Sequence, residues 1–200
     1  NDQELDSLIR NQLQANGFQE HFSNSLLSES FTRHFSGGEA VELKNPLSQD
    51  MAFIRNSILP GLLMAAVYNE KRQEKGFKLF EIGAVHNQSP KSETGYNEKF
   101  QLGLLWYGIP KLHWRNYEEM DLYRCKGDIQ RLLTSLGIQK INFKSGKAQG
   151  YVISLKIYSY KTQIGTVGIP ENGLLSQYDL NEPPFICDIN LTAVRDIWQN

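Results

Sequence analysis

Residue types that could carry chemistry occur in the chain, but few stand at spacings that a reaction or a metal requires. No two of the four histidines pair at the HxxxH or HxxH spacing of a zinc site; they are His21, His34, His86 and His113. Ser145-Gly146-Lys147 ends like a phosphate-binding loop, but Ile141 stands where such a loop has its first glycine, so we interpret the segment as a turn. No GxSxG or GxGxxG motif occurs. The sequence therefore predicts no catalytic, cofactor-binding or metal-binding residue.

Glu81 is the carboxylate with the least favourable predicted surroundings. In an alternating strand over 77–85 it shares a face with apolar residues only. A buried carboxylate without a partner is costly, so we expect a donor, for which Arg55 and Arg72 are the candidates. We interpret the arrangement as a structural ion pair; the alternative is a general base or a ligand for a substrate amine.

An aromatic and basic cluster, Trp114-Arg115 with Tyr117, has a composition that can stack on a nucleotide base. Such a cluster is more typical of a packed loop with a solvated arginine. The net charge is −1, from 21 basic and 22 acidic residues, and no run of Lys and Arg occurs. This balance does not indicate general electrostatic binding to a polyanion.

Periodicity of apolar residues predicts the elements that position these groups. Helices are predicted over 2–15, 57–71 and 126–136, and strands over 77–85, 99–107, 151–158, 162–169 and 184–191. The 57–71 helix is the most apolar, and its stripe must be covered by a core or by a partner. Helices early and in the middle, with strands joined by short loops, favour an α+β fold with a largely antiparallel sheet. We expect residues 1–200 to form a single domain.

Cysteine content and hydropathy indicate the kind of protein. Cys125 and Cys187 lack CxxC spacing and are predicted to be packed, reduced thiols in a cytoplasmic protein. No apolar stretch approaches the roughly 20 residues of a membrane span, and no leader pattern opens the chain. Both ends look cut, so we expect a fragment of a longer chain.

A series of short motifs runs in fixed order along most of the chain. In chain order, the first are GFQE at 17–20, NPLS at 45–48, IRNSILPGLL at 54–63, Asn69 with Arg72, and LFEIG at 79–83. Trp114 with Asp121, Tyr123, Lys126 and Gly127 comes next, and Ile164-Gly165 with Val167-Gly168 comes last. Together they resemble the β subunit of bacterial phenylalanine–tRNA ligase. The chain departs from that pattern at Ser145, where the family has proline, and at Ile169-Pro170, where it has His-Pro.

The resemblance implies a class II aminoacyl-tRNA-synthetase-like fold, an antiparallel sheet flanked by helices. It also implies a degenerate copy that packs against the α subunit, which carries the ATP and phenylalanine sites. The whole α₂β₂ enzyme would use ATP and Mg²⁺ to charge tRNA with phenylalanine, and this segment would hold no cofactor. An active class II site needs two arginines on the phosphates of ATP, whereas Arg195 stands alone after the last predicted strand. We therefore predict that the segment is inactive.

The resemblance also suggests a subunit interface. Class II domains dimerise through a long helix and a strand that ends at proline, and Asn45-Pro46 with the 57–71 helix resembles that region. The predicted interface residues are Asn45, Pro46, Arg55, Leu62, Ala65, Ala66, Asn69 and Arg72. The alternative is that the helix only fills the domain's own core. Two other functions remain open, a free-standing amino-acid ligase related to class II synthetases and a nucleic-acid-binding module.

Overall fold

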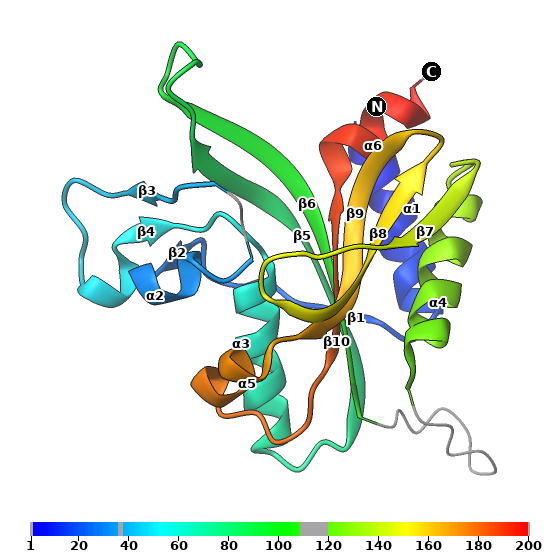
Figure 1. The fold of residues 1–200 in the computed structure, drawn as a ribbon, viewed down its shortest axis with the longest axis horizontal. Coiled ribbons are helices and arrows are strands. Elements are labelled where there is room, and N and C mark those ends of the chain that lie inside the picture. Colours follow the sequence, from blue (N-terminus) through cyan, green and yellow to red (C-terminus); the bar gives the residue numbers. More distant parts are fainter. Residues whose placement is uncertain (1, 36–37, 109–119, 200) are drawn as a thin grey trace.

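The structure, a computed structural model, describes residues 2–35, 38–108 and 120–199, so Trp114, Arg115 and Tyr117 lie outside the described residues. A seven-stranded sheet forms its centre, in the order β1-β5-β6-β10-β9-β8-β7 (Figure 1). The strands are β1 (Gln19–Glu20), β5 (Gly76–Gln88), β6 (Tyr96–Gly108), β7 (Ile141–Ser145), β8 (Tyr151–Ser159), β9 (Thr162–Pro170) and β10 (Phe185–Asn190). Only β1 and β5 pair in parallel. The predicted α+β fold with a largely antiparallel sheet is confirmed.

Helices cover both faces of the sheet. On one face lie α1 (Asp2–Ala15), α4 (Leu122–Ser135) and α6 (Leu191–Trp198) (Figure 1). On the other lie α3 (Leu59–Glu70) and α5 (Asn172–Tyr178), which share a second apolar cluster with the sheet. Beside them is a small sheet in the order β2 (Leu26–Leu27), β4 (Phe53–Ile54), β3 (Val41–Glu42), with the short helices α2 (Glu29–Thr32) and η1 (Gln49–Met51). No helix of the described residues is long and apolar enough to cross a membrane.

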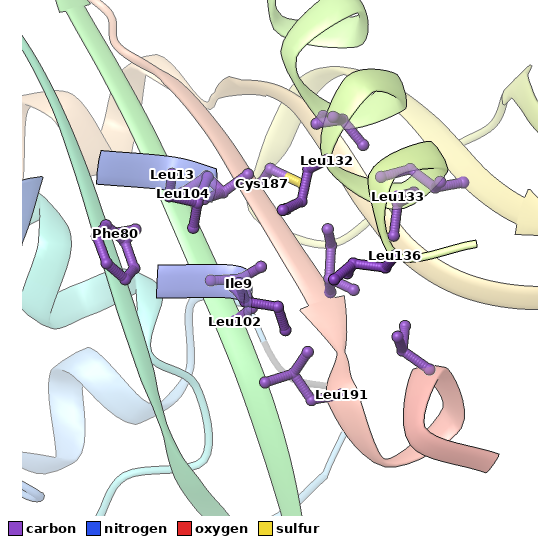
Figure 2. Packing of buried hydrophobic residues seen from close by; sticks show 14 of the residues in the cluster. Ile9, Leu13, Phe80, Leu102, Leu104, Leu132, Leu133, Leu136, Cys187 and Leu191 are labelled. Atoms are coloured by element: carbon purple, nitrogen blue, oxygen red, sulfur yellow. The ribbon is translucent and has the colours of Figure 1, made fainter. Parts of the chain in front are cut away.

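The main core forms where α1 and α4 pack on the central strands. Figure 2 shows Ile9 and Leu13 of α1 beside Leu102 and Leu104 of β6, and Leu132 of α4 beside Cys187 of β10. The intervening residues of β6 point to the other face and join the α3 cluster. Because both faces are covered, the central strands are apolar on both sides.

Several elements extend beyond the prediction for local reasons. Helix α4 begins at Leu122 because the side chain of Asp121 accepts a hydrogen bond of 2.7 Å from the backbone N–H of Arg124. Asn190 caps α6 in the same way, through the N–H of Ala193. Strands β5 and β6 continue through polar residues to the pair Gln88 and Tyr96, since the backbone ladder does not require apolar side chains.

The region that resembles a class II dimerisation motif is Asn45-Pro46 with helix α3. A helix followed by a strand at the sheet edge is formed by α1 and β1. Asn45-Pro46 lies instead in the loop between β3 and η1, and α3 packs on a face of the sheet rather than at its edge. The apolar stripe of α3 suggested an interface in the sequence, but the sheet itself covers that stripe.

Candidate functional site

A buried ion pair joins two of the motifs, IRNSILPGLL at 54–63 and LFEIG at 79–83. Arg55 Nη1 and Glu81 Oε1 are 2.5 Å apart, and their side chains are only 7% and 2% exposed. Glu81 Oε2 accepts hydrogen bonds from the backbone N–H of Ser23 at 3.2 Å and from its hydroxyl at 2.7 Å. Arg55 Nε donates to the carbonyl oxygen of Ala84 at 3.0 Å. Both charges are thus compensated and hydrogen-bonded, as buried charges must be.

The network joins three separate segments of the chain. Glu81 stands on β5 and points to the α3 face, Arg55 follows β4, and Ser23 lies between β1 and β2. Arg72, the other candidate partner, stacks instead on the ring of Tyr68, with Cζ 3.4 Å from the ring centroid. The ion pair therefore fixes the segment that precedes α3 against strand β5.

Two glycines of the motifs make room for this network. A Cβ at Gly83 would overlap the guanidinium of Arg55, and one at Gly61 would overlap the side chain of Ser23. Gly61 is within helix α3, where glycine lowers helix stability by up to about 1 kcal/mol relative to alanine. The close approach of Ser23 is the physical reason for a glycine at this helical position, as the approach of Arg55 is for Gly83.

The geometry of the network favours a structural role over a catalytic one. The oxygens of Glu81 already bind Arg55 and Ser23, and the carboxylate is almost wholly buried. In the part of the chain that the structure describes, no three His, Cys, Asp or Glu side chains are grouped so as to hold a metal ion. Cys125 and Cys187 are free and buried, as predicted, and burial raises the pKa of both thiols.

Arg195 and Asp188, to which the sequence assigned no partner, both form buried or partly buried hydrogen bonds away from this network. Arg195 of α6 donates two hydrogen bonds to the carboxylate of Asp6 on α1, at 2.9 and 3.0 Å. Asp188 of β10 accepts a hydrogen bond of 3.0 Å from the hydroxyl of Tyr151, and burial raises the pKa of this carboxyl to about 6. No sequence signal identified either pair, because the partners lie 189 and 37 residues apart.

A cavity of about 710 Å³ opens beside the exposed side of α3 and the edge strand β1. Four of the exposed side chains that line it are apolar or aromatic, beside Gln19, Asn24 and Asp50. Phe22 is 74% exposed, Tyr68 57%, Met51 37% and Met64 36%. Exposed apolar side chains gathered at a cavity are typical of a binding surface.

The predicted interface residues fall into three groups. Asn45 and Pro46 are exposed in a loop, and Arg72 is at the end of α3. Ala65 and Asn69 line the cavity, and Asn69 also donates to the carbonyl oxygen of Ala65 at 2.8 Å. A correction applies to Leu62 and Ala66, which are 0% exposed within this chain's own core, and to Arg55, which is buried against Glu81. Residues without accessible surface cannot bury more of it against a partner.

Comparisons with known proteins agree with this fold and these motifs. The family described as "Phenylalanyl tRNA synthetase beta chain CLM domain" matches residues 1–191. The chain is 31% identical over 168 residues, 82% of its length, to the phenylalanine–tRNA ligase beta subunit of Buchnera aphidicola, and 30% identical over 205 residues, 94% of its length, to that of Carboxydothermus hydrogenoformans. It spans only 21% and 25% of these two relatives.

The fold is also that of a class II synthetase. A crystal structure of pyrrolysyl-tRNA synthetase from Desulfitobacterium hafniense superimposes with a TM-score of 0.77 over 99% of this chain and 69% of that one, at 17% sequence identity. Such a low identity shows the fold alone. The ordered motifs, the antiparallel sheet flanked by helices and the match over residues 1–191 together show that this chain belongs to the family of phenylalanyl-tRNA synthetase beta chain CLM domains.

Proposed function

We propose that this chain is the non-catalytic, synthetase-like module of a phenylalanine–tRNA ligase β subunit, acting in the cytoplasm. It packs against the catalytic α subunit of an α₂β₂ enzyme that charges tRNA with phenylalanine. ATP and Mg²⁺ act in the α subunit, and the contribution of this chain is architectural.

The observation that supports this proposal is that the buried arginines are already bound by carboxylates. Arg55 and Arg195 are the two arginines buried in the described residues, and each is bound by a carboxylate, Glu81 and Asp6. The phosphates of ATP need free, preorganised cations, and arginine suits that task through its planar fork. Arg195 also faces α1, on the opposite side of the sheet from α3. These residues do not fit ATP, which favours a scaffold over an amino-acid ligase.

The cavity beside α3 is the surface that best suits the α subunit. Met64 and Tyr68 project from the side of α3 that the sheet leaves uncovered, and Phe22 and Met51 lie around the same cavity. Aromatic and Met side chains are enriched in the centres of protein interfaces. The adjoining edge strand β1 has two residues, and among the described strands it pairs with β5 alone, so a partner could pair with its outer side.

Association with the matching α subunit tests the proposal. The protein that contains this chain is mixed with the α subunit, and the mass of the complex is measured by gel filtration with light scattering. We expect a stable complex, weakened at least tenfold by Met64→Glu or Tyr68→Glu, because a charge would be buried at the interface. Tyr123→Glu is the control, since Tyr123 is 80% exposed on α4, away from the cavity.

The outcomes separate the parts of the proposal. If the folded wild-type protein does not associate, the packing function is withdrawn. If it associates and all three variants bind equally well, the function stands but the cavity is not the interface. Stabilisation of the protein by ATP, without the α subunit, would favour the free-standing ligase instead.

A further inference from the structure

One stretch of the chain has a net positive charge, because its basic residues are not balanced by acidic ones. Residues 129–170 contain five lysines and one arginine and no Asp or Glu. The whole chain has a net charge of −1, so the remaining residues carry −7. The near-neutral total therefore conceals a strong separation of charge between this stretch and the rest of the molecule.

Strand pairing brings two of these lysines together. Lys144 of β7 and Lys156 of β8 are direct partners in the antiparallel register. Directly opposed residues have Cβ atoms about 4.5–5.5 Å apart on the same face, where like charges are destabilising. Lys144 Nζ lies 5.1 Å from the ring centroid of Tyr158, and Lys156 Nζ lies 3.5 Å from Thr166 Oγ1.

Three further lysines extend this pair along the hairpin. At one end the backbone N–H of Tyr160 donates to the carbonyl oxygen of Lys140, which places Lys140 beside Lys161 at the β8–β9 turn. At the other end the Lys156 side chain lies over Gly146, next to Lys147. The lysine face comprises Lys140, Lys144, Lys147, Lys156 and Lys161. All except the partly buried Lys156 are exposed.

Within the described residues, none of these five lysines forms an ion pair. The carboxylate of Asp188 lies near Lys156, whose charge acts to lower the pKa of Asp188, and it accepts the hydrogen bond of Tyr151. A face of uncompensated lysines, two of them directly opposed, is stabilised when an anion binds across it.

We propose that the lysine face binds the phosphate backbone of an RNA, with Tyr160 stacking on an unpaired base. Lysines that follow a backbone, interspersed with exposed aromatic rings, are the combination that binds single-stranded nucleic acid. Tyr160 is 61% exposed at the same end as Lys140 and Lys161, and Tyr158 lies between the lysines. That the RNA is a tRNA rests on the proposed function.

Salt dependence of RNA binding tests the inference. The protein that contains this chain is titrated with a tRNA transcript and with oligouridine between about 50 and 200 mM salt. The triple variant Lys140→Gln, Lys144→Gln, Lys161→Gln should bind more weakly, with the slope of log K against log salt reduced by about 2 to 3. The matched control is Lys44→Gln, Lys75→Gln, Lys91→Gln, which removes the same charge from exposed loop positions elsewhere in the chain.

Stacking gives a second, charge-independent readout. Tyr160→Ala should weaken oligouridine binding by about fivefold or more, since stacking on a base contributes about 1–3 kcal/mol. The inference is overturned if the two triple variants give equal slopes, or if poly-glutamate displaces the RNA as well as an RNA of equal charge does. Circular dichroism melts of every variant show that the fold is kept. Association with the α subunit is measured in parallel, so its failure would remove the proposed function without affecting the RNA slopes.

Discussion

Replacing Arg55 by Met should be among the most destabilising changes that remove a polar contact from this chain. The substitution keeps the length of the apolar stem but leaves Glu81, with a side chain 2% exposed, without its cation. Breaking a buried pair from one side typically costs about 3–5 kcal/mol, which is a large part of a domain's total stability of about 5–15 kcal/mol. The loss of the bond to Ala84 acts in the same direction.

Hydrogen exchange with mass spectrometry measures this effect in the intact protein. We expect the opening free energies of peptides from β5 and α3 to fall by about 3–5 kcal/mol in Arg55→Met. The double variant Arg55→Met, Glu81→Leu should lose less than Arg55→Met alone, because no charge is then left unpaired. Arg33→Met is the control. Its partner is Glu29, both side chains are more than half exposed, and such a surface pair contributes about 0–1 kcal/mol.

Two results would refute the reasoning. A loss below about 1 kcal/mol in Arg55→Met would mean that the pair behaves like the exposed control. If the double variant loses as much stability as Arg55→Met and Glu81→Leu lose together when each is made alone, Arg55 and Glu81 are not energetically coupled.

The remaining predictions concern glycine, core and carboxylate positions. Gly83→Ala should destabilise the chain by displacing Arg55, whereas Gly127→Ala in α4, where a Cβ meets nothing within 4 Å, should stabilise it by about 1 kcal/mol; thermal melts compare the two. Ala66→Glu should abolish the near-UV circular dichroism of the folded state, because it places a charge at a position that is 0% exposed; a folded variant would contradict the core assignment. Asp188→Asn should stabilise the chain at pH 8 by up to about 3 kcal/mol and leave it unchanged at pH 4. The pKa of Asp188 is about 6 when folded and about 3.9 when unfolded, so the folded state binds more protons between these values and loses stability as pH rises through them. Urea unfolding at the two pH values measures this, and equal effects at both would contradict it.

Much of the architecture could be predicted because local patterns carried it. The alternation of Leu102, Leu104 and Trp106 identified a strand with one face in the main core, and that face packs as expected. Strands β5 and β6 reach beyond the predicted ranges 77–85 and 99–107, because their backbone pairing continues to Gln88 and Tyr96 without apolar side chains. The short helices α5 and α6 have too few residues for periodicity to identify them.

The sequence alone determined which residues had to find partners, and the tertiary structure decided which partners they found. A carboxylate on an apolar strand required a cation, which predicted a buried pair for Glu81. Arg55 rather than Arg72 became the partner because β4 ends at Ile54 and so places Arg55 next to Glu81 on the large sheet. The apolar stripe of α3 likewise required a cover, and only the assembled fold showed that the sheet covers Leu62 and Ala66 while Met64 and Tyr68 stay exposed. Lys144 and Lys156 became direct neighbours only through strand register, because register is set by pairing between strands and not by spacing along the chain.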